Sequence, residues 1–203
     1  MDAKCSAVVL TGGRSARMGS PKAALAFGAE TILERIVGEL ARSFGQIVIV
    51  AAPAEAESLP SSVAKAALVI HDETAYLGPL DALRRGLEAA AHDAVFACSC
   101  DLPMLDAGLA RGLCAMLDGS DAAIPRVDGK LQPLCAAYHR RCARAFSELG
   151  KKGVTRVREI VRLVNARIVD EAELRRFDPE LKSFLNVNTP EEYKRALRLA
   201  GLG

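Results

Sequence analysis

Short apolar segments alternate with longer segments of helical period along most of the chain. Several of the short segments are continuously hydrophobic, as expected for strands of a sheet that is covered on both faces. In the first longer segment Ile32, Ile36, Val37, Leu40 and Phe44 fall on one stripe, which predicts a helix with one buried face. The expected strands are 7–10, 47–51, 68–71, 94–98, 122–125, 134–138, 167–169 and 184–187, and the expected helices are 32–44, 80–91, 107–117, 140–149, 154–162 and 190–199.

Two helix starts carry strong signals. Thr31 and Glu34 form a capping box, and Thr189, Pro190 and Glu192 combine a cap, a first-turn proline and a second box. The alternation of strands and helices predicts an α/β fold, with three α/β/α layers around a mostly parallel, twisted, Rossmann-like sheet. In such sheets ligands bind outside the carboxyl ends of the strands, so the residues that follow each strand are the first candidates for a site.

The composition is that of a globular protein, with 50% hydrophobic and 26% charged residues and a net charge of +2. We expect one domain over residues 1–203, because this length suits a single well-buried core. Neither the charge nor its spread along the chain favours nucleic acid or an anionic membrane as a partner. No leader segment or membrane span is recognisable, so we expect a cytoplasmic protein.

The six cysteines lack the spacing of a zinc or redox motif, and most of them lie in apolar stretches. We expect them to be reduced core residues of a cytosolic protein. A metal or redox role for Cys98 and Cys100, which lie two residues apart, is the alternative.

A glycine turn with basic residues follows the first strand, in the sequence TGGRSARMGSPK. Gly12 and Gly13 leave the backbone open to an anion, while Arg17 and Lys22 supply positive charge for phosphate. The spacing fits neither the P-loop formula nor the dinucleotide-binding formula. The stretch therefore predicts a phosphate site of neither of these two kinds, and a plain glycine turn with solvated basic residues is the alternative.

Two later strands also end at candidate site residues. Asp72 follows the third strand, and Gly78 with Pro79 then makes a tight turn that directs a helix N-terminus towards the ligand edge. Asp101 follows the fourth strand and is placed to hold Mg²⁺ together with substrate phosphates. No nucleophile–base pair is evident, so transfer of a phosphorus group by positioning and charge neutralisation fits these residues best.

The same residues resemble the nucleotidyltransferases related to the molybdenum cofactor guanylyltransferase. That family's signature matches Leu10, Thr11, Gly12 and Gly13, then Arg17-Met18-Gly19 and Lys22. The resemblance continues in order through nearly the whole chain, at Gly78-Pro79-Leu80, Cys100-Asp101-x-Pro103, Gln132-Pro133-Leu134 with Tyr138, and Asn186-Val187-Asn188-Thr189-Pro190-Glu191.

The resemblance implies an enzyme that transfers GMP from GTP to the terminal phosphate of molybdopterin and releases pyrophosphate, with Mg²⁺ as cofactor. Carried over by position, Leu10, Thr11, Gly12, Gly13, Asp72 and Gly78 would contact the nucleotide. Arg17 and Lys22 would neutralise the triphosphate, and Asp101 would hold Mg²⁺ and contact the nucleotide. Asn186 and Asn188 would face molybdopterin, and hydrogen bonding at a strand end and turn before the Thr189 cap is their alternative role. The nucleotide half would be about residues 1–105 and the molybdopterin half about 106–203, with transient contacts to proteins that deliver and accept the cofactor.

Two positions depart from the family pattern. Ala82 stands where family members often have a glycine, and the run Val50-Ala51-Ala52-Pro53 lacks an asparagine that is common near the base. Cytidylyl transfer to molybdopterin, another nucleotidyl transfer on the same fold, and a non-catalytic nucleotide-binding module therefore stay open as alternatives.

Overall fold

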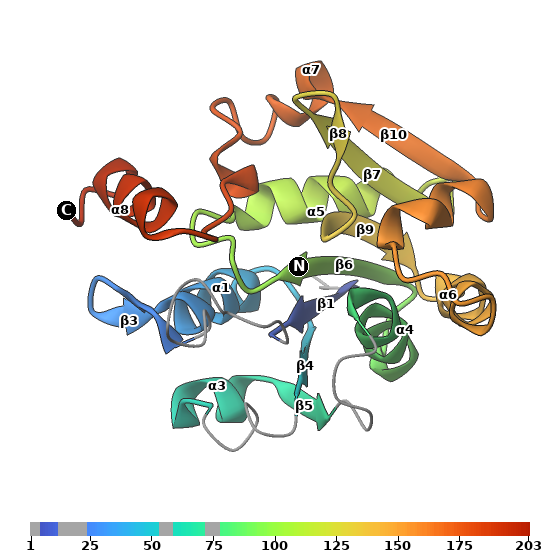
Figure 1. Cartoon of the computed structure of the whole chain (residues 1–203), viewed down its shortest axis with the longest axis horizontal. Helices are drawn as coiled ribbons and strands as arrows, with labels where there is room; N and C mark the ends of the chain where they lie inside the picture. The colour runs from blue at the N-terminus through green and yellow to red at the C-terminus, as the bar shows by residue number, and fades with distance from the viewer. Residues whose placement is uncertain (1–4, 12–23, 53–58, 72–77) are drawn as a thin grey trace.

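A mixed β-sheet runs through the chain in the computed structural model, which describes residues 5–11, 24–52, 59–71 and 78–203. Within these residues its strand order is β10-β7-β9-β6-β1-β4-β5, with the short β8 paired to β7 (Figure 1). β9 is antiparallel to both of its neighbours, and the other strands on this path pair in parallel. The strands are β1 (Cys5–Leu10), β4 (Gln46–Ala51), β5 (Leu68–His71), β6 (Ala94–Ser99), β7 (Ala122–Val127), β8 (Lys130–Leu131), β9 (Cys135–His139) and β10 (Ala166–Asp170).

Helices cover both faces of this sheet, and a separate hydrophobic cluster fills the space on each side. One cluster packs α1 (Ile32–Ala41), α3 (Ser61–Ala66), α5 (Ala107–Ala115), α7 (Glu171–Leu174) and α8 (Pro190–Leu199) against the sheet. The other packs α4 (Pro79–Ala89), α6 (Cys142–Lys151) and a 3₁₀ turn, η2 (Val157–Arg162). The predicted three-layer α/β/α fold with a mostly parallel sheet is therefore confirmed.

The helix starts follow the local chemistry of the sequence. Thr31 and Thr189 each accept a hydrogen bond from the backbone of Glu34 and Glu192, and each glutamate bonds back, so both predicted capping boxes form. Asp106 caps α5 by accepting from Leu109 N. These caps satisfy amide groups that would otherwise lack a partner at the helix ends.

α4 lies unusually close to the sheet. A Cβ atom added at Gly86 would sit less than 3.0 Å from Cγ1 of Val8 on β1, and 3.3 Å from Cγ2 of Val50 on β4. Val8 and Val50 are both buried. The absence of a side chain at Gly86 thus sets the distance between α4 and the central strands.

The chain reverses its direction of travel across the sheet at β1. After β1 it adds β4 and β5 on one side, and it then returns to add β6 on the other side. Open α/β sheets bind ligands at such a switch point, outside the carboxyl ends of the strands. The ends of β1 and β6, at Leu10 and Ser99, pair with each other and mark this position.

The segment 184–187, predicted as a strand, is not one. A 3₁₀ turn, η3 (Lys182–Phe184), follows Leu181 at φ 54°, and the carboxylate of the buried Asp178 accepts from Ser183 N at 2.7 Å. The apolar residues Phe184 and Val187 are buried because they cover one hydrophobic cluster, and this explains the misleading hydrophobic run.

Other differences from the predicted elements are smaller. The expected helix 154–162 is reduced to η2, in which Val157 and Ile160 are buried. The pattern also missed several short elements, which are β2 (Ala26–Phe27), β3 (Glu30–Thr31), α3, β8 and α7. Elements this short carry too few residues to show a hydrophobic period.

Candidate active site

The ends of β1, β4 and β6 are held together by backbone hydrogen bonds. Thr11 N donates to Val50 O at 3.0 Å, and Cys100 N donates to Leu10 O at 3.0 Å. Leu10 and Thr11 are buried, and each residue exposes only 5% of its surface to solvent. The start of the predicted nucleotide loop is therefore fixed to the strands on both sides, directly at the switch point.

Asp101 lies two residues beyond β6, beside this start. Ser99 Oγ donates a hydrogen bond to Asp101 Oδ1, and Val187 N donates to Asp101 O at 2.9 Å. The first contact orients the carboxylate, and the second ties its backbone to the segment that contains Asn186 and Asn188. The structure thus brings the predicted metal ligand next to both predicted substrate sides.

The N-terminus of α4 begins at the same edge of the sheet. Gly78 caps it at φ 92°, a conformation that L side chains rarely adopt, so glycine is required here. Asp81 in the first turn accepts hydrogen bonds from Arg84 Nε at 2.9 Å and Arg85 Nε at 3.1 Å. Burial lowers the pKa of Arg84, but its bonds to Asp81 and Glu88 outweigh this and raise the pKa. The acidic charge that this chain has at Asp81 is therefore balanced within the helix.

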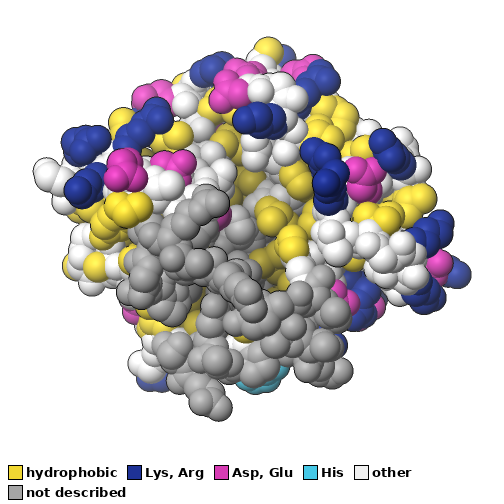
Figure 2. Space-filling model, viewed as in Figure 1, with side chains coloured by type: hydrophobic (Ala, Val, Ile, Leu, Met, Phe, Trp, Pro, Cys, Tyr) yellow, Lys and Arg dark blue, Asp and Glu magenta, His cyan; other side chains and the backbone are white. Residues whose placement is uncertain are grey.

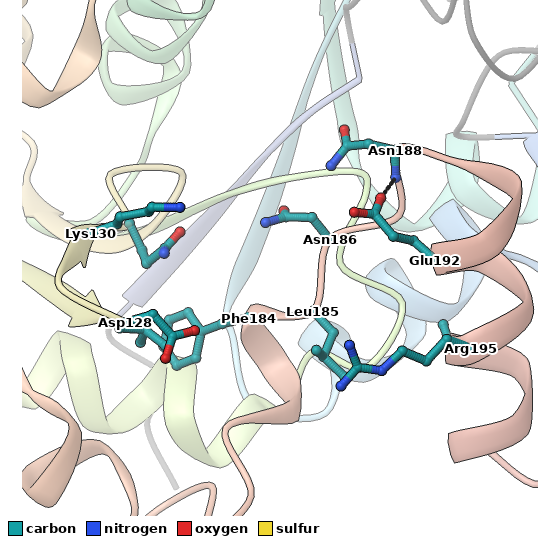
Figure 3. Close-up of a pocket in the computed structure, with 11 residues that line it drawn as sticks. Asp128, Lys130, Phe184, Leu185, Asn186, Asn188, Glu192 and Arg195 are labelled. Atoms are coloured by element: carbon teal, nitrogen blue, oxygen red, sulfur yellow. Dashed lines mark hydrogen bonds between the residues drawn. The ribbon is translucent and has the colours of Figure 1, made fainter.

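A cavity of about 370 Å³ lies beside the Asp101 segment, between β8, the chain after η3, and α8 (Figure 3). Amide, cationic and acidic side chains share this cavity with apolar ones. Figure 2 shows the same face in space-filling form, with hydrophobic side chains in its hollowed middle and Lys and Arg side chains nearby. The cavity is lined by Val127, Asp128, Lys130, Gln132, Phe184, Leu185, Asn186, Asn188, Glu192, Arg195 and Ala196.

Hydrogen bonds hold the backbone of both cavity walls in place. On one wall, Gln132 N donates to Pro125 O at 2.9 Å, and Ser99 N donates to Leu134 O at 3.0 Å. On the other wall, Asn188 N donates to Glu192 Oε2 at 2.7 Å, within the capping box of α8. Asn186 is exposed in the cavity, as expected for a residue that contacts a substrate.

The described residues settle the position of only part of the predicted site. Leu10, Thr11, Gly78, Asp101, Asn186 and Asn188 gather at the carboxyl edge or in the adjoining cavity. Gly12, Gly13, Arg17, Lys22 and Asp72 lie outside the described residues, so their roles stay predictions.

Sequence reasoning missed Ser99, Lys130 and Arg195. Ser99 could have been found from its position two residues before Asp101, since both follow the same strand. Lys130 follows an Asp128-Gly129 pair, a common signal for a tight hairpin, and both residues have positive φ (48° and 70°). Arg195 carries no local signal, because only the packing of α8 brings it to the cavity.

The donor set at Asp101 fits Mg²⁺ held mainly by a substrate. Within the described ranges no group of three or more His, Cys, Asp or Glu residues could hold a metal alone. Mg²⁺ commonly takes one or two protein carboxylates and completes its shell with water and substrate phosphates. A single oriented carboxylate at the switch point matches that arrangement.

The six cysteines all lie in the described residues, where they are buried and form no disulfide. Burial raises the pKa of the Cys98 thiol well above its usual value, so this thiol is neutral at pH 7. Among the helices of the described residues, none combines the length and hydrophobicity that a membrane crossing requires.

The fold is that of an α/β protein with a candidate ligand site at the switch point of its sheet. Residues 7–171 match the MobA-like NTP transferase domain. The chain therefore belongs to the MobA-like NTP transferase family, which confirms the resemblance seen in the sequence, and it is a nucleotidyltransferase.

Similar proteins support this assignment. The chain is 33% identical to a probable molybdenum cofactor guanylyltransferase of Pelotomaculum thermopropionicum, over 97% of this chain and 94% of that one. It superposes with a TM-score of 0.83 and 26% identity on molybdopterin-guanine dinucleotide biosynthesis protein A of Archaeoglobus fulgidus, covering 97% of this chain and 98% of that one. A cytidylyltransferase of Thermus thermophilus, 2-C-methyl-D-erythritol 4-phosphate cytidylyltransferase, shares the fold at 18% identity and a TM-score of 0.71, covering 96% and 98%.

Proposed function

We propose that this protein transfers GMP from GTP to the terminal phosphate of molybdenum-bound molybdopterin, forming the guanine dinucleotide cofactor and pyrophosphate. The observation that carries the proposal is the hydrogen bond between Val187 N and Asp101 O. It joins the segment that contains Asn186 and Asn188 to the backbone of Asp101, which supports a site for two substrates. Two substrates can therefore meet at one carboxylate, and the named relatives act in this chemistry.

The reaction proceeds by in-line displacement. An oxygen of the acceptor phosphate forms a bond to the α-phosphorus of GTP, and the bond from that phosphorus to the bridging oxygen of the β-phosphate breaks. The nucleophile is already an anion, so the protein needs no strong general base. Its main tasks are to align the two phosphates and to offset their repulsion.

Named residues perform these tasks in the proposal. Thr11 and the turn that follows it hold the nucleotide at the end of β1, while Arg17 and Lys22 neutralise the triphosphate. Asp101, oriented by Ser99, would hold Mg²⁺, which when bound stabilises the charge on the departing pyrophosphate. Asn186 and Asn188 position the acceptor from the other side.

Cytidylyl transfer on the same fold is the second candidate. The described end of β4 offers only the small buried side chains of Ala51 and Ala52 near the expected base position. A base at this position would then be recognised by backbone groups. No side chain at the described end of β4 would favour guanine over cytosine. Melting curves with GTP, CTP, ATP and UTP, each with Mg²⁺, separate the two candidates, because a tightly bound ligand stabilises the fold. A shift with GTP alone supports guanylyl transfer, and a shift with CTP alone overturns it.

A pyrophosphate-release assay with purified molybdopterin, GTP and Mg²⁺ tests the reaction itself. We expect turnover by the native enzyme and, by analogy with loss of one oxyanion donor, a loss of about 10²–10³-fold in Asp101→Asn. Glu88→Gln, on the outer face of α4, serves as the matched carboxylate control. Binding of GTP without any turnover would favour a non-catalytic nucleotide-binding module, and near-normal turnover by Asp101→Asn would refute the metal assignment.

We place this activity in the cytoplasm, supported by six buried cysteines that form no disulfide, which suits a reducing compartment. Direct transfer of the cofactor would require transient contacts with proteins that supply and accept it. A complex with such a protein, detected by analytical ultracentrifugation with purified partners, would test this part of the proposal.

A further inference from the structure

Two cationic side chains face the cavity beside Asp101 and have no assigned role. Lys130 comes from β8 and Arg195 from the second turn of α8, so they approach from opposite walls (Figure 3). In the described part of the chain neither forms an ion pair, although many other arginines do, such as Arg126 with Asp170 and Arg141 with Asp121. Cations that lack a protein partner beside a catalytic edge are available for an anionic ligand.

The two cations stand on elements that are held in place. The hairpin that carries Lys130 is closed at Asp128 and Gly129, and its following loop is bonded to β7 and to the end of β6. α8 begins at a complete capping box, and its Ala196 is buried in the core. Lys130 and Arg195 are therefore presented from fixed backbone positions, which lowers the entropy lost when they bind a ligand.

Two acidic side chains, Glu192 and Asp128, also line the cavity that Lys130 and Arg195 face. Glu192 is committed to the backbone, since it accepts bonds from Asn188 N at 2.7 Å and Thr189 N at 3.1 Å. Asp128 lines the cavity at the turn beside Lys130, on the side of Phe184. The apolar surface of the cavity, from Phe184, Leu185 and Ala196, suits a ring system between the charged ends.

We propose that Lys130 and Arg195 determine acceptor specificity by binding an anionic acceptor from its two ends. Lys130, on the wall bonded to the end of β6, binds the phosphate that attacks the nucleotide. Arg195, on the α8 wall, binds an electronegative group at the far end of the acceptor's ring system. The inference rests on the proposed function and adds the two side chains that select the acceptor within this cavity.

Steady-state kinetics with saturating GTP and varied acceptor test this assignment. Lys130→Met and Arg195→Met keep the apolar stem and remove the charge, and each should raise the KM for the acceptor about tenfold, as expected for loss of one charge-assisted hydrogen bond. The KM for GTP and the melting temperature should stay unchanged. Arg195→Lys should restore part of the loss. Lys194→Met and Arg198→Met, exposed on the same helix but outside the cavity lining, are matched controls that should behave like the native protein.

The dependence of the acceptor KM on ionic strength is a further test. It would not change if Lys130 and Arg195 had only a structural role. Added salt should raise the acceptor KM of the native enzyme, and this dependence should be weaker in the Lys130→Met/Arg195→Met double variant. An unchanged acceptor KM in both single variants, with an active native enzyme, overturns the inference alone. A native enzyme that transfers no nucleotide to the acceptor overturns the proposed function first, so the two failures are distinguishable.

Discussion

Replacing Gly86 by alanine should destabilise the protein, although alanine is the better helix former. Gly86 lies inside α4 and faces the sheet, where a Cβ atom would approach Cγ1 of Val8 to below 3.0 Å, Cγ2 of Val8 to 3.1 Å and Cγ2 of Val50 to 3.3 Å. Neither valine has room to withdraw, because both are buried and β-branched side chains have few rotamers. The helix must therefore move away from the sheet.

The magnitude follows from two opposing effects. Glycine to alanine within a helix contributes about 1 kcal/mol of stability through helix propensity. Overpacking a well-packed core costs about 1–3 kcal/mol, and a contact this close belongs at the upper end. We therefore expect a net loss of about 2 kcal/mol, which for a chain of this size lowers the melting temperature by roughly 4–8 °C.

Urea unfolding and calorimetry measure this effect against a matched control. Gly38 lies in α1, is exposed, and an added Cβ there would meet nothing within 4 Å. Gly38→Ala should therefore stabilise the protein by about 0.5–1 kcal/mol. The same substitution type is thus expected to change sign between the two helices.

A double-mutant cycle isolates the contact. Val8→Ala removes the methyl groups that Gly86→Ala would strike, so the double variant should be more stable than the sum of the two single effects predicts. The reasoning is refuted if Gly86→Ala is as stable as the native protein, or if the cycle shows additive effects.

Two further predictions concern titratable groups. Bonds from Asn165 N and Arg141 keep the pKa of Asp121 below its usual value, so its contribution is present above about pH 4 and is lost as pH falls through the lowered pKa. Unfolding measured from pH 6 to pH 2 should show a smaller loss of stability in Asp121→Asn than in the native protein, and equal acid sensitivity would exclude this role. A hydrogen bond with Cys114 lowers the pKa of the Cys5 thiol to about 6, against the opposing effect of burial and with further lowering by Arg111. Iodoacetamide at pH 7 should therefore alkylate Cys5 before the other five cysteines, as peptide mass spectrometry can show, and first labelling at Cys98 would contradict this order.

Much of the fold could be predicted because its central strands are buried on both faces. β1, β4 and β6 appear in the sequence as continuous apolar runs, and the capping boxes at Thr31 and Thr189 mark two helix starts. The segment 184–187 was misread for the same reason. Its apolar residues are buried, but Leu181 in the left-handed region and the bond from Ser183 N to Asp178 turn the chain out of the sheet direction.

The candidate site was predictable only where it follows a strand. Thr11 and Asp101 are found in this way, because the carboxyl ends of parallel strands share one edge of the sheet. Lys130 and Arg195 are far apart in the sequence and meet one cavity only through the placement of β8 and α8. No local sequence pattern shows that these two residues meet at one cavity. The acceptor side of the site could therefore be identified only from the structure.

The cavity wall formed by residues 184–196 has a consequence for how specificity can be exchanged between relatives. The region that matches the family ends at residue 171, whereas this wall comes from the chain after it. It joins the catalytic edge mainly through Val187 and buries Phe184 and Ala196 in the core. A chimaera that takes residues 172–203 from a relative with another acceptor should therefore exchange the Arg195 wall of the cavity, while Lys130 and the nucleotide side stay those of this chain.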